Sequence, residues 1–184
     1  TADRLAEWLM GQPWCGTVVS ARAVGEIEGT LPAALVGAEG PRTPDLAMSF
    51  AWDSEPNAAG YIGHVISTNA HAADHGSLSR QEVRSVLVAR GPSFKRGVSV
   101  SAPTGNVDVA PTVLSILGLP GHEEMDGRVL HEALAGGPDH SPPKWTAEVH
   151  VAERSVGPEV YRQEIAVSMA GGVRYADYGR GWRE

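Results

Sequence analysis

The stretch Gly105-Asn106-Val107-Asp108-Val109-Ala110-Pro111-Thr112 decides the fold prediction for this chain. Asp108 is a favourable N-cap residue, and Pro111 falls in the first helical turn, where its missing N–H costs little. We therefore predict a helix over residues 109–117 that ends at Gly118. The side of this helix predicted to be buried carries Val109, Val113, Leu114 and Leu117.

The segments before this helix predict a strand and a helical turn. Val83–Ala89 is a mostly apolar run that Gly91-Pro92 stops, which is typical of a buried strand. We place this strand at the centre of a sheet. Ser79-Arg80-Gln81-Glu82 matches a capping box, so we expect one helical turn there.

The N-terminal part predicts further helices and strands. Thr1 is a suitable cap for a first helix that ends near Gly11, and residues 17–19 and 45–52 have the composition of strands. A shorter helix is expected over residues 128–135. The apolar residues of the first helix that recur at helical spacing are Leu5, Trp8 and Leu9. This alternation of helices and strands favours an α/β fold.

The C-terminal part differs in character. Residues 138–143 form a Pro-rich linker, and three segments after it alternate or carry β-branched and aromatic residues between turns. They are Trp145–Arg154, Tyr161–Met169 and Gly172–Tyr178. We predict a β-hairpin or meander here, and a domain division into residues 1–137 and 138–184.

Composition excludes several classes of function. A net charge of −7 over 184 residues argues against a basic surface for nucleic acid. No apolar run approaches the roughly 18–20 residues that span a bilayer. The single cysteine, Cys15, excludes an internal disulfide and a zinc site built from cysteines. The cellular compartment stays open.

A long loop over residues 53–77 gathers several potential metal ligands. It carries His64, His71, Asp74 and His75, and imidazole nitrogen suits zinc. His75 precedes Gly76, so it is either a ligand or a loop histidine bonded to the backbone. We assign solvated loop positions to His64 and His71, and turn positions to Asp53 and Glu55.

Three blocks carry a resemblance to a known family. Residues 73–79, 91–95 and 105–112 are similar in order and spacing to the C-terminal part of the alkaline phosphatase superfamily. The branch most resembled is that of the type I phosphodiesterases and nucleotide pyrophosphatases, over about residues 1–134. The resemblance implies an α/β/α sandwich, two zinc ions, and a Thr or Ser nucleophile that lies upstream. Because the chain begins at Thr1 rather than Met, we expect a fragment or a processed piece.

The resemblance also implies residue roles. His75 resembles the late, single zinc ligand of the family, with Asp74 as its neighbour, because the next two blocks follow at the family's distances. Asp108 is interpreted as a helix cap, and Asp126-Gly127 resembles a structural turn. Arg174, Tyr175 and Asp177 are within the class of residues that bind substrates, but no mechanism requires them.

These expectations lead to one main functional hypothesis and its alternatives. The main one is the C-terminal part of a dizinc phosphodiesterase or nucleotide pyrophosphatase that acts on a small phosphodiester or nucleotide, with this piece inactive alone. The alternatives are a sulfatase or phosphomonoesterase of the same superfamily, or a non-catalytic binding module that keeps the fold. The expected partner is the missing N-terminal half, or a second copy of the chain.

Overall fold

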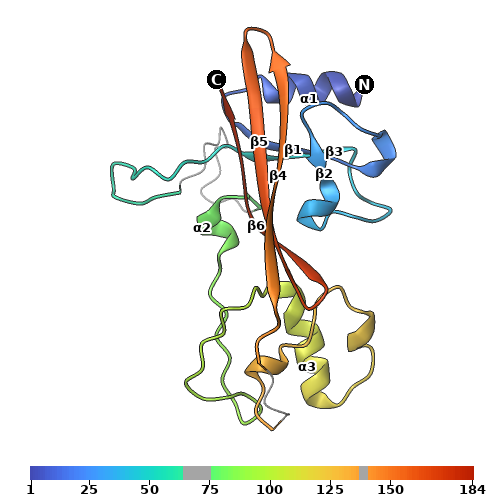
Figure 1. Ribbon diagram of the computed structural model, residues 1–184, viewed down its shortest axis with the longest axis vertical. Helices are drawn as coiled ribbons and strands as arrows, with labels where there is room; N and C mark the ends of the chain where they lie inside the picture. Colours follow the sequence, from blue (N-terminus) through green and yellow to red (C-terminus); the bar gives the residue numbers. More distant parts are fainter. Residues whose placement is uncertain (64–75, 137–140) are drawn as a thin grey trace. The chain divides into compact units, whose positions relative to one another are not determined.

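The computed structural model describes residues 1–63, 76–136 and 141–184 (Figure 1). It combines helices with two three-stranded sheets, consistent with the α/β class. The chain divides into two compact units. The first comprises Thr1–Ser85, Glu148–Val167 and Ala176–Glu184, and the second comprises Val86–Ala147 and Ser168–Tyr175. The domain division expected at residue 137 stays a prediction.

The first unit is built on a small mixed sheet. Its strands β1 (Cys15–Ser20), β2 (Leu31–Pro32) and β3 (Leu46–Phe50) lie in the order β2-β1-β3. β1 runs parallel to β2 and antiparallel to β3. Both strands predicted in this part of the sequence are therefore present. Every residue of β1 is buried, which makes it the central strand of this unit.

Helix α1 (Ala2–Met10) is present as predicted, and Leu9 packs against the core. Ala6 and Met10 are fully buried, whereas Leu5 and Trp8 are 50% and 55% exposed. The small Ala6 lets the helix approach the sheet closely, and Met10 reaches into the cluster around Cys15. The Trp8 ring lies edge-on to Trp14, with centroids 6.0 Å apart.

Three long strands form the second sheet, in the order β4-β5-β6. They are β4 (Trp145–Val156), β5 (Glu159–Ala170) and β6 (Val173–Arg183), and each extends beyond its predicted end. Two-residue connections join them, so neighbouring strands run antiparallel. Gly171 and Gly172 have φ of +57° and +85°, a left-handed backbone that favours glycine in tight hairpin turns.

Within the first unit, β5 is tied to β1 by buried polar side chains. The Gln163 amide is fully buried: its Oε1 accepts from Val18 N at 2.9 Å and its Nε2 donates to Val18 O at 2.8 Å. Tyr161, also fully buried, donates its hydroxyl to Gly16 O at 2.6 Å. Gln163 thus pairs with β1 much as a neighbouring strand would.

The Cys15 thiol lies in the same buried region. Its side chain is fully buried in a cluster with Met10, Val18 and Tyr161. Burial raises the pKa of Cys15 to about 11, against a smaller lowering by Arg183. Cys15 therefore acts as a small buried hydrophobe.

The second unit contains α3 (Val109–Leu117), whose bounds confirm the predicted helix. Short 3₁₀ turns precede and follow it, among them Asn106–Asp108 and His131–Ala133. The helix expected over residues 128–135 is wrong, because its backbone groups bond elsewhere. Leu130 N donates to Thr112 Oγ1, and Leu134 forms an antiparallel bridge with Phe94.

Two further packing predictions for the second unit are wrong. The expected central strand Val83–Ala89 is not a strand: Val83 ends the short helix α2 (Arg80–Val83), and Val86 and Val88 are 89% and 81% exposed. A buried strand needs neighbours on both edges, and no described strand pairs with this run. On α3, Leu114 is half-buried and the residues that are exposed instead of buried are Val109, Val113 and Leu117.

The Gln163 pairing leads to a stability prediction. Replacing Gln163 by Leu leaves the N–H and carbonyl of Val18 buried without that partner, which costs about 1–3 kcal/mol per group. We expect Gln163→Leu to lower the free energy of unfolding, measured by urea denaturation, by more than about 2 kcal/mol. Gln12→Leu is the matched control, because Gln12 makes one exposed hydrogen bond to Trp8 O. Equal losses in the two variants would contradict the role of Gln163.

Candidate functional site

The predicted metal ligand, His75, lies in the part of the chain that is not described, together with the other candidates of its loop. His64, His71, Asp74 and His75 all fall within residues 64–75. Within residues 1–63, 76–136 and 141–184, no group of three or more His, Cys, Asp or Glu side chains is placed to hold a metal ion. Asp53 accepts from Glu55 N at 2.9 Å, which confirms its turn position.

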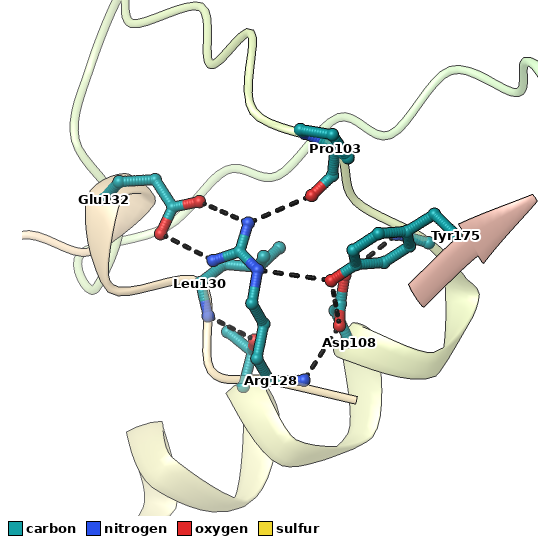
Figure 2. A network of polar contacts seen from close by, with 8 residues as sticks. Pro103, Asp108, Arg128, Leu130, Glu132 and Tyr175 are labelled. Carbon is teal, nitrogen blue, oxygen red and sulfur yellow. Dashed lines mark hydrogen bonds and ion pairs between the residues drawn. The ribbon is translucent and has the colours of Figure 1, made fainter. Parts of the chain in front are cut away.

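The most connected polar cluster of the second unit is centred on Asp108 (Figure 2). Asp108 is fully buried at the start of α3, yet its carboxylate does not cap that helix. One oxygen accepts from Gly105 N and the other from Arg128 N, each at 2.9 Å. The Tyr175 hydroxyl lies 3.0–3.1 Å from both oxygens. The helix-cap interpretation is corrected: Asp108 closes the 3₁₀ turn before α3 and binds two distant segments.

Arg128 and Glu132 form a mostly buried ion pair beside Asp108. The Arg128 nitrogens lie 3.0 and 2.7 Å from the two Glu132 oxygens, and the side chains are 10% and 4% exposed. Burial by itself raises the pKa of Glu132, but the hydrogen bond and charge of Arg128 outweigh it and lower that pKa. Arg128 also donates to Pro103 O and to the Tyr175 hydroxyl. Four of the five N–H donors of the Arg128 guanidinium are thus used within the cluster.

Tyr175 completes the cluster from β6. Its pKa is raised to about 12, first by burial and then by the charge and hydrogen bond of Asp108, against smaller opposing contributions from Arg128. The hydroxyl therefore stays protonated at neutral pH and acts as a hydrogen-bond donor to the carboxylate. Of the three C-terminal candidates Arg174, Tyr175 and Asp177, Tyr175 is the one drawn into this cluster.

The turn predicted at Asp126-Gly127 supports the same cluster. A Cβ at Gly127 would overlap the backbone carbonyl of Val107, so only glycine lets the two segments approach this closely. This approach brings Arg128 N to the Asp108 carboxylate. The turn is thus structural, as predicted.

The arrangement is suited to holding the fold rather than to turnover. The polar side chains of the cluster are hydrogen-bonded to other groups of the cluster. These side chains are Asp108, Arg128, Glu132 and Tyr175. Sequence reasoning missed Arg128 and Glu132. Their opposite charges four residues apart were the available signal.

A separate cavity of about 1340 Å³ lies in the first unit. It is lined by residues between Ser20 and Thr43, among them Arg22, Glu26 and Glu28. None of the residues singled out from the sequence lines it.

Comparison with known proteins gives one partial similarity. A stretch of 54 residues is 41% identical to a putative extracellular sulfatase Sulf-1 homolog of Caenorhabditis elegans, covering 29% of this chain and 8% of that protein. No family model matches the chain, and no solved structure matches it. The similarity points to the alkaline phosphatase superfamily and to a hydrolase, and it gives no support to the type I phosphodiesterase branch. Among the described helices, none is long and apolar enough to cross a membrane.

The Asp108 cluster leads to a prediction about pH. Tyr175→Phe removes hydrogen bonds to Asp108 and Arg128, so we expect a loss of about 1–3 kcal/mol in unfolding free energy at pH 7. The raised pKa of Tyr175 stabilises the fold fully below about pH 10, and that contribution is lost as pH rises towards about 12. The difference between wild type and variant should therefore shrink over this window in urea titrations.

Tyr61→Phe is the control for this experiment, because Tyr61 is 72% exposed. Its unfolding free energy should stay within about 0.5 kcal/mol of wild type. A difference between wild type and Tyr175→Phe that stays constant from pH 9 to 12 would contradict the prediction.

Proposed function

We propose that this chain is the C-terminal part of a sulfatase-type hydrolase of the alkaline phosphatase superfamily. The observation that carries the proposal is the 41% identity over 54 residues to a putative extracellular sulfatase. The three sequence blocks over residues 73–112 also resemble that superfamily. The proposed reaction is hydrolysis of an ester of a tetrahedral oxyanion, with the nucleophile on another part of the protein.

The phosphodiesterase hypothesis is the second candidate. It rests on the spacing of residues 73–79, 91–95 and 105–112, which resembles that of the type I phosphodiesterases. The two chemistries are related, because both transfer a tetrahedral centre and develop negative charge on its oxygens. They are distinguished by the substrate.

We also propose that His75 is a metal ligand in the complete protein. The basis is its position before Gly76 and the distance to the next two blocks. Zinc sites in hydrolases use about three protein ligands and leave one position open. His75 would supply one nitrogen, and the other ligands would come from elsewhere in the protein. A bound zinc would supply Lewis-acid stabilisation of the ester oxygens.

Turnover by the full-length gene product tests the reaction class. We expect hydrolysis of p-nitrophenyl sulfate at a higher kcat/KM than that of bis(p-nitrophenyl) phosphate. The reverse order would favour the phosphodiesterase hypothesis. Absence of turnover on both esters, in protein with its metal content measured, would favour the non-catalytic binding module.

The metal proposal has its own variant. In the full-length product, His75→Ala should lower metal occupancy, measured by mass spectrometry, and reduce turnover by about 10²-fold or more. His150→Ala is the control, since His150 lies on β4 near Glu148 and belongs to none of the three blocks. Full occupancy and full activity in His75→Ala would remove His75 from the metal site.

The exposed apolar residues of the second unit support a partner surface. Val86, Leu87 and Val88 are 89%, 51% and 81% exposed. Val109, Val113 and Leu117 lie on one side of α3 at spacing of four and are also exposed. Exposed apolar side chains that gather in one unit are typical of a surface that a partner covers. We propose that the rest of the hydrolase supplies this cover and so completes the α/β/α sandwich.

Two charged substitutions test this partner surface. In the 184-residue chain alone, Val88→Asp and Leu117→Asp should change the unfolding free energy by less than about 0.5 kcal/mol, because both sites are exposed. In the full-length product each should cost more than about 3 kcal/mol, since the new charge is then buried without a partner. Val98→Asp, at a residue 54% exposed in the same unit, is the control. Equal effects in the two proteins would contradict the proposal.

A further inference from the structure

Arg80 makes no ion pair with an acidic side chain among the residues that the structure describes. It begins α2, is half-buried, and its guanidinium carbon lies 4.2 Å from the centroid of the Tyr178 ring. Among the described residues, its guanidinium makes no hydrogen bond, and it makes a cation–π contact with the Tyr178 ring. The N–H donors of this arginine are therefore left for solvent or for a ligand.

The backbone that carries Arg80 is held from both sides. Leu78 N donates to Ser49 Oγ at 2.9 Å, and Leu78 O accepts from Gly179 N at 2.9 Å. Ser79 is fully buried, and its hydroxyl donates to a backbone carbonyl at 3.1 Å. Because the position is fixed before any ligand arrives, less conformational freedom is lost on binding.

The aromatic ring beneath Arg80 is fixed as well. The Tyr178 hydroxyl donates to Glu164 at 3.1 Å, and the Trp52 ring lies edge-on to Tyr178 with centroids 6.4 Å apart. Glu164 also accepts from Arg180 at 2.8 Å. The Glu164 carboxylate is thus paired with Arg180, and no acidic side chain of the described residues pairs with Arg80.

We propose that Arg80 binds a sulfate group of the substrate, with the Tyr178 ring as its support. The inference rests on the proposed function and adds a binding residue to it. A planar guanidinium matches two oxygens of a tetrahedral oxyanion and forms two parallel hydrogen bonds with them. Stacking on Tyr178 holds the plane of the fork while leaving its edge free. A phosphate group has the same geometry, so the experiment compares both anions.

The 184-residue chain tests anion binding without any need for turnover. Sodium sulfate is titrated against the chain, and the Arg Nε–H resonances are followed by NMR, with sodium chloride at equal ionic strength as the reference for screening. We expect sulfate to shift the Arg80 resonance in a saturable way. Arg80→Gln should abolish saturable sulfate binding, and Arg80→Lys should weaken it about tenfold, because lysine lacks the fork.

Arg84→Gln is the matched control, since Arg84 is an exposed arginine at the end of the same helix. It should bind sulfate like the wild type. Equal, non-saturable shifts with sulfate and chloride would overturn the proposal, as would unchanged sulfate binding in Arg80→Gln with the circular dichroism spectrum preserved. Tighter binding of phosphate than of sulfate would overturn the assignment to a sulfate group.

Kinetics of the full-length product separate this proposal from the proposed function. Arg80→Gln should raise KM for p-nitrophenyl sulfate about tenfold and change kcat less than about twofold. If the wild type hydrolyses no sulfate ester but Arg80 still binds sulfate, the proposed function fails and the anion site stands. If the wild type is active and Arg80→Gln leaves KM unchanged, the anion site falls and the function stands.

Discussion

The amide of Gln163 performs the task of a backbone segment inside the first unit. It offers one acceptor and one donor to Val18, the middle of the central strand β1, at 2.9 and 2.8 Å. β1 is buried along its whole length, so every polar group of its backbone needs a partner within the protein. The pairing explains why a glutamine occupies a fully buried position on β5, where an apolar residue would leave those groups unpaired.

In the second unit, the buried Asp108 side chain likewise bonds to groups on other segments of the chain. A carboxylate at the start of a helix ordinarily bonds to the first helical N–H groups. Here it turns away from α3 to Gly105, Arg128 and Tyr175, three segments that are far apart in the sequence. The buried carboxylate of Asp108 is stabilised by the hydrogen bonds that it accepts from Gly105 N, Arg128 N and the Tyr175 hydroxyl. Removing any one donor leaves a buried anion short of its partners.

Local sequence signals predicted where helices and strands occur, because those signals act over a few residues. Asp108, Pro111 and Gly118 placed α3 correctly. The predictions that failed are the strand over Val83–Ala89, the helix over residues 128–135 and the burial of several apolar side chains. Val86–Val88 and the Val109–Leu117 side of α3 are apolar but exposed, since burial depends on partners that the described residues do not supply.

In the candidate site too, local features were predicted from the sequence and contacts between distant residues were not. The turn at Asp126-Gly127 was recognised from its residue types, whereas the bonds of Asp108 to Arg128 and Tyr175 join residues 20 and 67 positions apart. No local pattern encodes such pairings. For His75 the sequence remains the source of the assignment, because residues 64–75 are outside the described part of the chain.

The burial of Cys15 makes the alkylation rate of its thiol a measure of how often the first unit opens. The thiol is fully buried and its pKa is raised to about 11, so the reactive thiolate is scarce in the native state. Alkylation therefore proceeds only through openings that expose β1, and its rate reports the free energy of those openings. Since Cys15 is the single cysteine in the chain, the alkylation rate reports on opening of the first unit alone. An unfolding event confined to the second unit would leave that thiol unlabelled, which allows the cooperativity of the two units to be measured without any substitution.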